Sequence, residues 1–517
     1  MNGNKEAVVS TKSGKLEGNF ENGIYVFKGV PYAAPPVGDL RWMPPRPVKP
    51  WQGIRNAQKF GPIAPQNLMP AMGPVALAPS FEGQAQSEDC LYLNVWTPGL
   101  DNARRPVFFW IHGGAFIIGA GTEAFLEEGV LARRGDIVVV SINYRLGALG
   151  FMNLDEVTGG KIPASGNEGL LDQIAALDWV QENIAAFGGD PDNVTISGFS
   201  AGGMSVSHLL TMEAARGKFH KALNRSGAAN TIAPLDSCVD ITREYLKIFN
   251  LDGRDVKAIR SLSVSQLLDG QQELNNRLRE RDHRATPFQP VVDGKIMREL
   301  PMVSIKKGSA RNIPIMSGTS LDELKMMTLM DPATRTIDEE GVINWLSGMI
   351  PEEHVPGLVS AYGEALKKRG GNVTPADILA SINMDFMFRI PAIRQVEMQR
   401  DHGTPAYNYL FTYRSPAVGG VLGAMHGLDN PFLFGALDDV LTGRDEELED
   451  LATKMQDSAI AFMRTGDPSC KTAGNWPVYG NDRMTMIFDR NPRVEAAPYE
   501  MERAAWEKIE FLFTPPL

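Results

Sequence analysis

The 517-residue sequence predicts an α/β protein with a large, mostly parallel sheet and helices on both faces. Three observations predict it. Short apolar and β-branched runs alternate with stretches of helical pattern through the first half of the chain. A mainly helical region follows over about 235–420, which we interpret as a cap or regulatory insertion. No repeat and no linker divides the sequence, so we expect a single domain over 1–517.

The expected elements begin with short β-like runs over 7–10 and 23–27, which predict a small N-terminal antiparallel sheet. A Pro- and Gly-rich coil over 31–66 leads to a segment over 67–87, rich in Met, Pro, Ala and Gly, that we expect to be a mobile loop. The remaining expected elements are, in chain order, strands over 91–96, 107–111 and 137–142, a helix over 168–187, a strand over 193–197, a helix from 201, strands over 313–317 and 406–412, and helices over 446–464 and 500–513.

Composition excludes several classes of partner. The formal net charge of −11 argues against nucleic acid and against an anionic membrane surface. No apolar run is long enough to cross a bilayer, and the polar N-terminus predicts no secretory leader. Three cysteines do not make a disulfide framework, so we expect a cytoplasmic protein. We also expect a monomer or a weak homo-oligomer.

The residues 198–202 read Gly-Phe-Ser-Ala-Gly and stand between the expected strand over 193–197 and an expected helix. A glycine-flanked serine in this context is typical of the nucleophile elbow of α/β-hydrolases. The chain must reverse there within a few residues, and a side chain at either glycine would collide with the turning backbone. A turn without chemistry is the plainer alternative. We expect Ser200 to expose its hydroxyl above the sheet.

A serine nucleophile needs a general base and an acid that orients the base, and in this fold both follow the serine in sequence. Among the seven histidines, His426 lies in a Gly-rich turn beyond the expected strand over 406–412, where a loop can display its side chain. An ordinary exposed loop histidine is the alternative. Asp322 and Glu323 are both candidates for the acid, and the pattern alone does not choose between them. A helix-terminal acid is the other interpretation of Glu323.

The segment over 110–116 reads Trp-Ile-His-Gly-Gly-Ala-Phe and follows the expected strand over 107–111. It matches the loop that supplies backbone N–H groups to an oxyanion hole, and the amide of Ala201 would complete that hole. Each such donor contributes about 2.7–4 kcal/mol to transition-state stabilisation.

The sequence resembles the type-B carboxylesterases, a family that includes bacterial para-nitrobenzyl esterases, mammalian liver carboxylesterases and cholinesterases. The resemblance is strong over about 20–230 and continues more thinly to the end of the chain. The matching blocks are 27–38 with Arg41, 87–98, 143–145, 166–173, 187–191 and 475–477.

This resemblance implies an α/β-hydrolase fold and a serine carboxylesterase that hydrolyses small-molecule esters through an acyl-enzyme, without a metal or an organic cofactor. It implies that Ser200 is the nucleophile, His426 the base and Glu323 the acid. The implied oxyanion donors are the amides of Gly114, Ala115 and Ala201. The neighbouring residues expected to contact the substrate are Phe199, Gly113 and Phe116.

Three departures from the family pattern refine the expectation. Phe199 replaces a frequent glutamate before the nucleophile, which argues against choline esters and favours uncharged esters. Ala115 replaces a usual glycine, keeping its N–H while adding a methyl group. The usual disulfide partner of Cys90 is replaced by Ala64, so we expect a free buried thiol and an unpinned loop over 67–87 that lines the gorge.

Two alternatives stay open at this point. A serine hydrolase of the same fold can cleave amides or carbamates, since the pocket selects the leaving group. A non-catalytic binding or adhesion relative is the second alternative, although such relatives typically lack the serine or another member of the triad.

Overall fold

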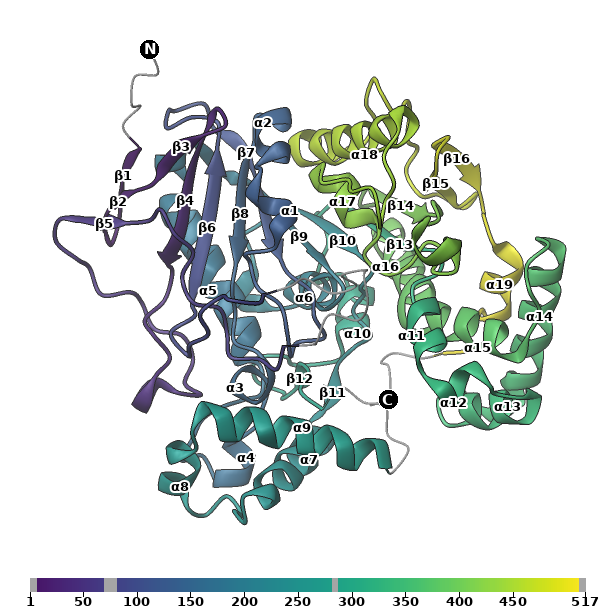
Figure 1. Cartoon of the computed structure of the whole chain (residues 1–517), viewed down its shortest axis with the longest axis horizontal. Helices are drawn as coiled ribbons and strands as arrows, with labels where there is room; N and C mark the ends of the chain where they lie inside the picture. The colour runs from purple at the N-terminus through teal and green to yellow at the C-terminus, as the bar shows by residue number, and fades with distance from the viewer. Residues whose placement is uncertain (1–6, 69–80, 281–286, 511–517) are drawn as a thin grey trace. The chain divides into compact units, whose positions relative to one another are not determined.

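The computed structural model describes residues 7–68, 81–280 and 287–510 (Figure 1). Most of the loop expected over 67–87 therefore lies outside the described residues. The described chain forms two compact units, which we call unit 1 (7–223 and 231–304) and unit 2 (224–230 and 305–510). The single domain expected over 1–517 stays a prediction.

The sheet of unit 1 is parallel at its centre. Strand β7 (Arg105–Ile111) pairs in parallel with both β8 (Val138–Ile142) and β9 (Gly189–Phe199). Strand β7 is buried along nearly its whole length, as expected for a parallel strand covered on both faces. The order in this unit is β9-β7-β8-β6-β4-β3, with antiparallel β6 (Tyr92–Thr97), β4 (Ile24–Pro31) and β3 (Asn19–Glu21) on one side.

Helices cover both faces of this sheet (Figure 1). Helix α6 (Ala201–Leu209) packs on β7 and β9, and α2 (Val130–Gly135) packs on β6 and β8. The long helix expected over 168–187 is α5 (Glu168–Asn183), closed by a 3₁₀ turn over Ile184–Phe187. The other helices that begin in unit 1 are α1 (Ala124–Glu127), α3 (Gly147–Gly150), α4 (Asp155–Thr158), α7 (Leu235–Ile248), α8 (Val256–Ser261), α9 (Val264–Glu280) and α10 (Pro301–Lys306).

Strand β10 (Lys221–Arg225) takes the chain from unit 1 into unit 2. In unit 2, β13 (Ile315–Ser320) and β14 (Ala406–Phe411) pair in parallel, β15 (Met484–Phe488) joins β14 in parallel, and β16 (Arg493–Ala496) closes antiparallel. Helix α16 (Ile390–Asp401) packs on β13 and β14. The other helices of this unit are α11 (Lys325–Met330), α12 (Pro332–Arg335), α13 (Glu339–Ser347), α14 (Val355–Lys368), α15 (Pro375–Met384), α17 (Asp429–Phe434), α18 (Glu446–Thr465) and α19 (Glu500–Ala505).

The N-terminal strands differ in detail from the expectation. The small sheet consists of β1 (Val8–Thr11), β2 (Gly14–Glu17) and β5 (Ile54–Asn56), of which β1 and β2 pair antiparallel and β2 and β5 in parallel. The run expected over 23–27 is β4, and it joins the large sheet against β6. Strand β4 is buried on both faces, which suits a sheet covered by other elements better than a small exposed one.

The last helix is shorter than the expected span over 500–513. It ends at Ala505, and the guanidinium of Arg394 then donates to the carbonyls of Trp506 (2.9 Å) and Ile509 (2.6 Å). These bonds satisfy carbonyls in a non-helical turn, while the Trp506 indole is buried. Residues 511–513 lie outside the described chain. No helix in the described part of the chain combines the length and apolarity needed to cross a bilayer.

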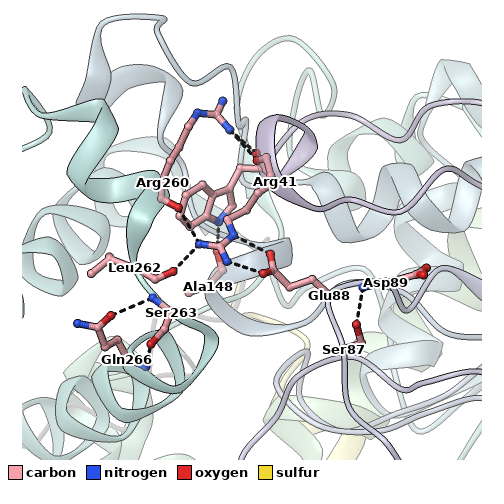
Figure 2. Close-up of polar contacts among 11 residues, drawn as sticks. Arg41, Ser87, Glu88, Asp89, Ala148, Arg260, Leu262, Ser263 and Gln266 are labelled. Carbon is pink, nitrogen blue, oxygen red and sulfur yellow. Dashed lines mark hydrogen bonds and ion pairs between the residues drawn. The ribbon is translucent and has the colours of Figure 1, made fainter.

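A largely buried ion pair anchors the N-terminal coil of unit 1 (Figure 2). The Arg41 guanidinium forms a two-point pair with Glu88 and also donates to the carbonyls of Arg260 (3.0 Å) and Leu262 (2.5 Å). Arg41 therefore joins three segments that are distant in sequence. Removing one partner would leave the other charge buried without compensation, which is costly.

A second pair of this kind lies deeper in unit 1. Arg145 binds Asp172 through two nitrogens at 2.8 and 2.7 Å and donates to the carbonyl of Met43. Both charged side chains are almost fully buried. Cys90 is a free, buried thiol, as expected, and burial raises the pKa of that thiol well above its usual range.

The contribution of two buried histidines to the stability of the protein should fall as the pH drops below about 6.5. Burial lowers the pKa of His112 to about 4 and of His208 to about 3, so the folded state resists protonation. The unfolded chain binds these two protons near pH 6.5. Each histidine therefore contributes a slope of up to about 1.4 kcal/mol per pH unit to the free energy of unfolding, and this contribution is complete above pH 6.5.

The check is urea unfolding at a series of pH values from 7 to 4.5 for the wild type and for His208→Gln. We expect the variant to show a shallower pH slope by about one proton. Equal slopes would contradict the assignment of a neutral buried His208, whatever the absolute stability of the variant.

Candidate active site

The serine of the 198–202 motif sits on a strained turn. Strand β9 ends at Phe199, helix α6 begins at Ala201, and Ser200 between them adopts φ 57° and ψ −124°. A non-glycine residue rarely adopts such a backbone conformation unless its surroundings enforce it. The expected strand–turn–helix geometry is therefore present around Ser200.

Close backbone packing enforces this turn. A Cβ atom at Gly202 would lie 2.0 Å from the carbonyl oxygen of Ile111 and 2.7 Å from that of His112. A Cβ atom at Gly198 would lie 2.3 Å from the carbonyl of Gly202. Real Cβ atoms do not approach backbone atoms so closely, so both positions require glycine. The start of α6 is thereby pressed against the end of β7.

The loop after β7 lies directly against the serine turn. A Cβ atom at Gly113 would lie 2.7 Å from the carbonyl oxygen of Phe199 and 3.1 Å from the Cβ of Ser200. Gly114 and Ala115 follow with φ angles of 108° and 52°. Their amides donate no hydrogen bond to any residue that the structure describes, so both N–H groups remain available to a ligand.

His112 stiffens the base of this loop. Its imidazole stacks on the Tyr144 ring at 4.4 Å, its Nδ1 lies 2.8 Å from the carbonyl oxygen of Gly113, and its own carbonyl accepts a hydrogen bond from the Tyr144 hydroxyl. Since burial keeps this imidazole neutral, it supports the loop as a packed ring and adds no charge.

Two of the three expected substrate contacts are aromatic, and they differ in burial. Phe116 adopts φ 63° and packs its ring on Phe151 at 5.0 Å, with 1% of the residue exposed. Phe199 is half-buried at the end of β9. The burial of Phe116 makes it part of the support of the loop. Contacts of Phe199, Gly113 and Phe116 with substrate stay predictions.

The expected acid and base meet in unit 2. Glu323 is fully buried, and its Oε2 is hydrogen-bonded to Nδ1 of His426, while its Oε1 accepts from the amide of Ser320 at 2.7 Å. A carboxylate on Nδ1 favours the neutral tautomer that has its proton there, which leaves Nε2 as an acceptor. The imidazole is thus prepared to accept a proton at Nε2.

Asp322 makes a different set of contacts, although it is adjacent in sequence. Its carboxylate accepts from the amide of Ala424 at 2.8 Å, and its own amide donates to the Ala424 carbonyl at 3.0 Å. A Cβ atom at Gly423 would lie 2.2 Å from Asp322 Oδ2. Asp322 therefore holds the loop that presents His426. The sequence left these two acids undecided, and their contacts distinguish them.

A buried ion pair lies next to the same loop. Arg225 lies 2.6 Å from Asp429, three residues after His426, and the Tyr409 hydroxyl donates to Asp429 at 3.1 Å. Both ionic side chains are almost fully buried. This pair could not be predicted from the sequence, because nothing local in sequence connects β10 with the residues after His426.

A second unanticipated contact comes from a π-helical turn over Asp385–Arg389, which places the Phe388 ring 5.1 Å from the His426 ring. Pro391 lacks the N–H that would bond the Met387 carbonyl, and the side-chain amide of Asn230 donates to that carbonyl instead (3.4 Å). A proline inside a helical run is a signal for such an irregularity. π-turns of this kind occur frequently at functional sites.

Comparison with known proteins identifies the family. The chain matches the Carboxylesterase family over residues 5–506. This chain belongs to the carboxylesterase family. It is accordingly a carboxylic ester hydrolase of the serine carboxylesterase class, and the fold expected from the sequence, an α/β-hydrolase, is confirmed.

The relatives of this carboxylesterase match over nearly their whole length. The para-nitrobenzyl esterase of Bacillus subtilis (strain 168) is 36% identical over 508 residues, 96% of this chain and 97% of that protein. A phenmedipham hydrolase of Pseudarthrobacter oxydans is 34% identical over 95% of this chain and 96% of its own. The crystal structure of a Geobacillus stearothermophilus carboxylesterase at pH 6.2 gives a TM-score of 0.85 at 35% identity, covering 97% of this chain and all of that one.

The packing around the serine turn predicts a severe effect of Gly202→Ala. The added methyl group collides with two backbone carbonyls that cannot move independently, so the variant should lose about 3 kcal/mol or more of stability. Gly357→Ala is the matched control, because nothing lies within 4 Å of its Cβ position in helix α14, and it should be neutral or up to about 1 kcal/mol more stable. Urea unfolding midpoints measure both. A Gly202→Ala protein as stable as the wild type would contradict the packing argument.

Proposed function

We propose that the carboxylesterase acts through a triad of Ser200, His426 and Glu323, with an oxyanion hole formed by the amides of Gly114, Ala115 and Ala201. The observation that carries this proposal is the hydrogen bond between the buried Glu323 carboxylate and Nδ1 of His426. It leaves Nε2 as the proton acceptor that a serine nucleophile requires. The strained turn at Ser200, with the amides of the neighbouring loop, supports the same assignment.

In the proposed reaction, His426 Nε2 takes the hydroxyl proton of Ser200 as its oxygen attacks the ester carbonyl. Glu323 holds the imidazole in its productive tautomer and stabilises the imidazolium. The tetrahedral intermediate collapses, the C–O bond to the alcohol breaks, and the imidazolium gives its proton to the leaving alcohol. Water then attacks the acyl-enzyme with His426 again as base, which releases the carboxylic acid and regenerates Ser200.

The substrates that we propose are uncharged small-molecule esters. Phe199, next to the nucleophile, offers an apolar half-buried surface where a carboxylate would favour cations. Ala115 holds a left-handed conformation that costs an alanine about 1 kcal/mol, so the loop geometry is maintained by its surroundings.

We further propose a cytoplasmic location, in keeping with the unpaired buried thiol of Cys90, and a monomer or weak homo-oligomer.

Replacing the nucleophile should abolish turnover. Ser200→Ala should lower kcat for a para-nitrophenyl ester by about four to six orders of magnitude, because the remaining groups cannot form an acyl-enzyme. Ser205→Ala is the matched control on the same helix α6, where the buried hydroxyl only accepts a hydrogen bond from Gln173, and it should keep kcat within about tenfold of the wild type.

The same preparations can be assayed on a matched aryl ester, anilide and carbamate, and on phenmedipham. Ester turnover should be the fastest. A near-normal rate for Ser200→Ala would contradict the proposed nucleophile, whereas loss of activity together with a preference for the anilide or carbamate would contradict only the proposed leaving group.

The two adjacent acids should separate in a kinetic comparison. Glu323→Gln removes the charge that stabilises the imidazolium and should lower kcat by about 10³- to 10⁴-fold. Asp322→Asn retains an oxygen that can accept from Ala424, so its kcat should fall by less than about tenfold. Steady-state kinetics on one para-nitrophenyl ester measures both. A larger loss in Asp322→Asn than in Glu323→Gln would exchange their proposed roles.

A further inference from the structure

Unit 2 contains a cavity with polar side chains in its lining, which does not include Glu323 or His426. It lies among the π-turn, α16, β14, the start of β15 and the residues that lead into α19. The room for water-sized groups inside it is about 20 Å³, which accommodates one or two small groups. The lining groups that matter here are Arg389, Arg483, Arg503, Tyr479, Asn408 and Glu500.

Arg483 is an arginine without a hydrogen-bonded partner. Its guanidinium donates to no acceptor within the described chain, and its Nε is buried. The nearest carboxylate oxygens belong to Glu397 at 3.6 Å and Glu500 at 3.7 Å, both beyond hydrogen-bond distance. A buried donor ordinarily has an acceptor, so the N–H group on Nε of Arg483 calls for one.

Two further arginines each retain one free nitrogen. Arg389 uses Nε and Nη2 on Asp385, and Arg503 uses Nε and Nη2 on Glu500. For both residues, Nη1 has no hydrogen-bond acceptor among the residues described. The Arg389 side chain is only 6% exposed, so few water molecules can reach this nitrogen from outside the cavity.

Tyr479 adds a neutral donor to the same cavity. The residue is 2% exposed, and its hydroxyl has no hydrogen-bond partner in the described chain. Burial raises the pKa of this phenol far above its usual value, so it keeps its proton. It can therefore donate to an occupant of the cavity.

Two of the three carboxylates near the cavity already accept hydrogen bonds, and the third, Glu397, lies 3.6 Å from Arg483. Glu500 is the carboxylate in the lining, and both of its oxygens accept from Arg503. Asp385 is likewise occupied by Arg389 and by the Tyr362 hydroxyl. The lining thus has three guanidinium groups against one carboxylate, and its unused polar groups are mainly donors. Water would fill the space, but an anion can accept from several of these donors at once through charge-assisted hydrogen bonds.

The backbone around the cavity shows the same kind of local strain as the serine turn. Arg483, Ala497 and Tyr499 all adopt left-handed φ angles of 54°, 46° and 57°. A hydrogen bond of 3.2 Å from the amide of Ala497 to the carbonyl of Arg483 joins the two strained segments. Strain of this type costs about 1–3 kcal/mol per residue and persists where the surroundings fix the geometry, often at ligand sites.

We propose that this cavity is a binding site for one small inorganic anion of chloride size, held by Arg483, by the Nη1 atoms of Arg389 and Arg503, and by the hydroxyl of Tyr479. The anion joins the π-turn, β15 and the residues before α19, so binding stabilises unit 2. None of these four residues belongs to the proposed triad.

The experiment is thermal unfolding of the full chain in sodium chloride against sodium gluconate, mixed at one fixed ionic strength. Gluconate is too large for the space. The wild type should show a chloride-dependent rise in Tm that saturates, as expected for a ligand that binds only the folded state. Arg483→Gln should raise the chloride concentration at half-saturation by about tenfold or more.

Arg298→Gln is the matched control, because Arg298 is 72% exposed and pairs with Glu213 at the surface, and it should keep the wild-type response to chloride. Tyr479→Phe, which changes no charge, should raise the chloride concentration at half-saturation severalfold. This variant tests the proposal if Arg483→Gln does not fold. A wild-type Tm that is the same in chloride and gluconate would overturn the proposal. So would an unchanged chloride response in Tyr479→Phe together with an unchanged or unmeasurable one in Arg483→Gln.

Discussion

The geometry of the serine turn depends on one close approach between two backbones. The first residues of α6 pass so near the carbonyls of Ile111 and His112 that only glycine fits at position 202. This contact presses the helix onto the end of β7, forces Ser200 into a left-handed conformation and brings Gly113 alongside it. The serine turn and the loop with unused amides are therefore products of the same packing constraint. Local strain of this kind is compensated by the packing around it, and it keeps the Ser200 hydroxyl, the proposed nucleophile, close to the proposed donors.

In unit 2, hydrogen bonds and ion pairs hold the loop that carries His426. Two adjacent carboxylates make different contacts: Asp322 accepts from the backbone of the histidine loop, and Glu323 contacts the imidazole ring. The buried pair of Arg225 and Asp429 and the ring of Phe388 support that loop from other elements. A histidine held from several sides loses little freedom on binding a substrate, which suits the proton transfer that we propose for His426.

The serine turn could be predicted from the sequence because the residues that define it are close together in the chain. The strand, the glycine-flanked serine and the helix after it lie within about twenty residues, and their steric requirement can be read directly from the spacing. The choice between Asp322 and Glu323 was not local, since it depends on a loop a hundred residues away, and only the family resemblance pointed to Glu323. The place of β4 in the large sheet and the early end of α19 were missed for the same reason, because they depend on distant partners, namely β6 and Arg394. The π-turn was missed although Pro391 is a local signal for it.

The central claim is that Ser200 is an activated nucleophile, and the most direct test is covalent labelling. A fluorophosphonate probe phosphonylates an activated serine oxygen with loss of fluoride, and tandem mass spectrometry of the digested protein locates the adduct. The account predicts one adduct per chain, on Ser200, with ester hydrolysis lost in proportion to labelling. An adduct on another residue, or an unlabelled Ser200 in a protein that still hydrolyses esters, would contradict it.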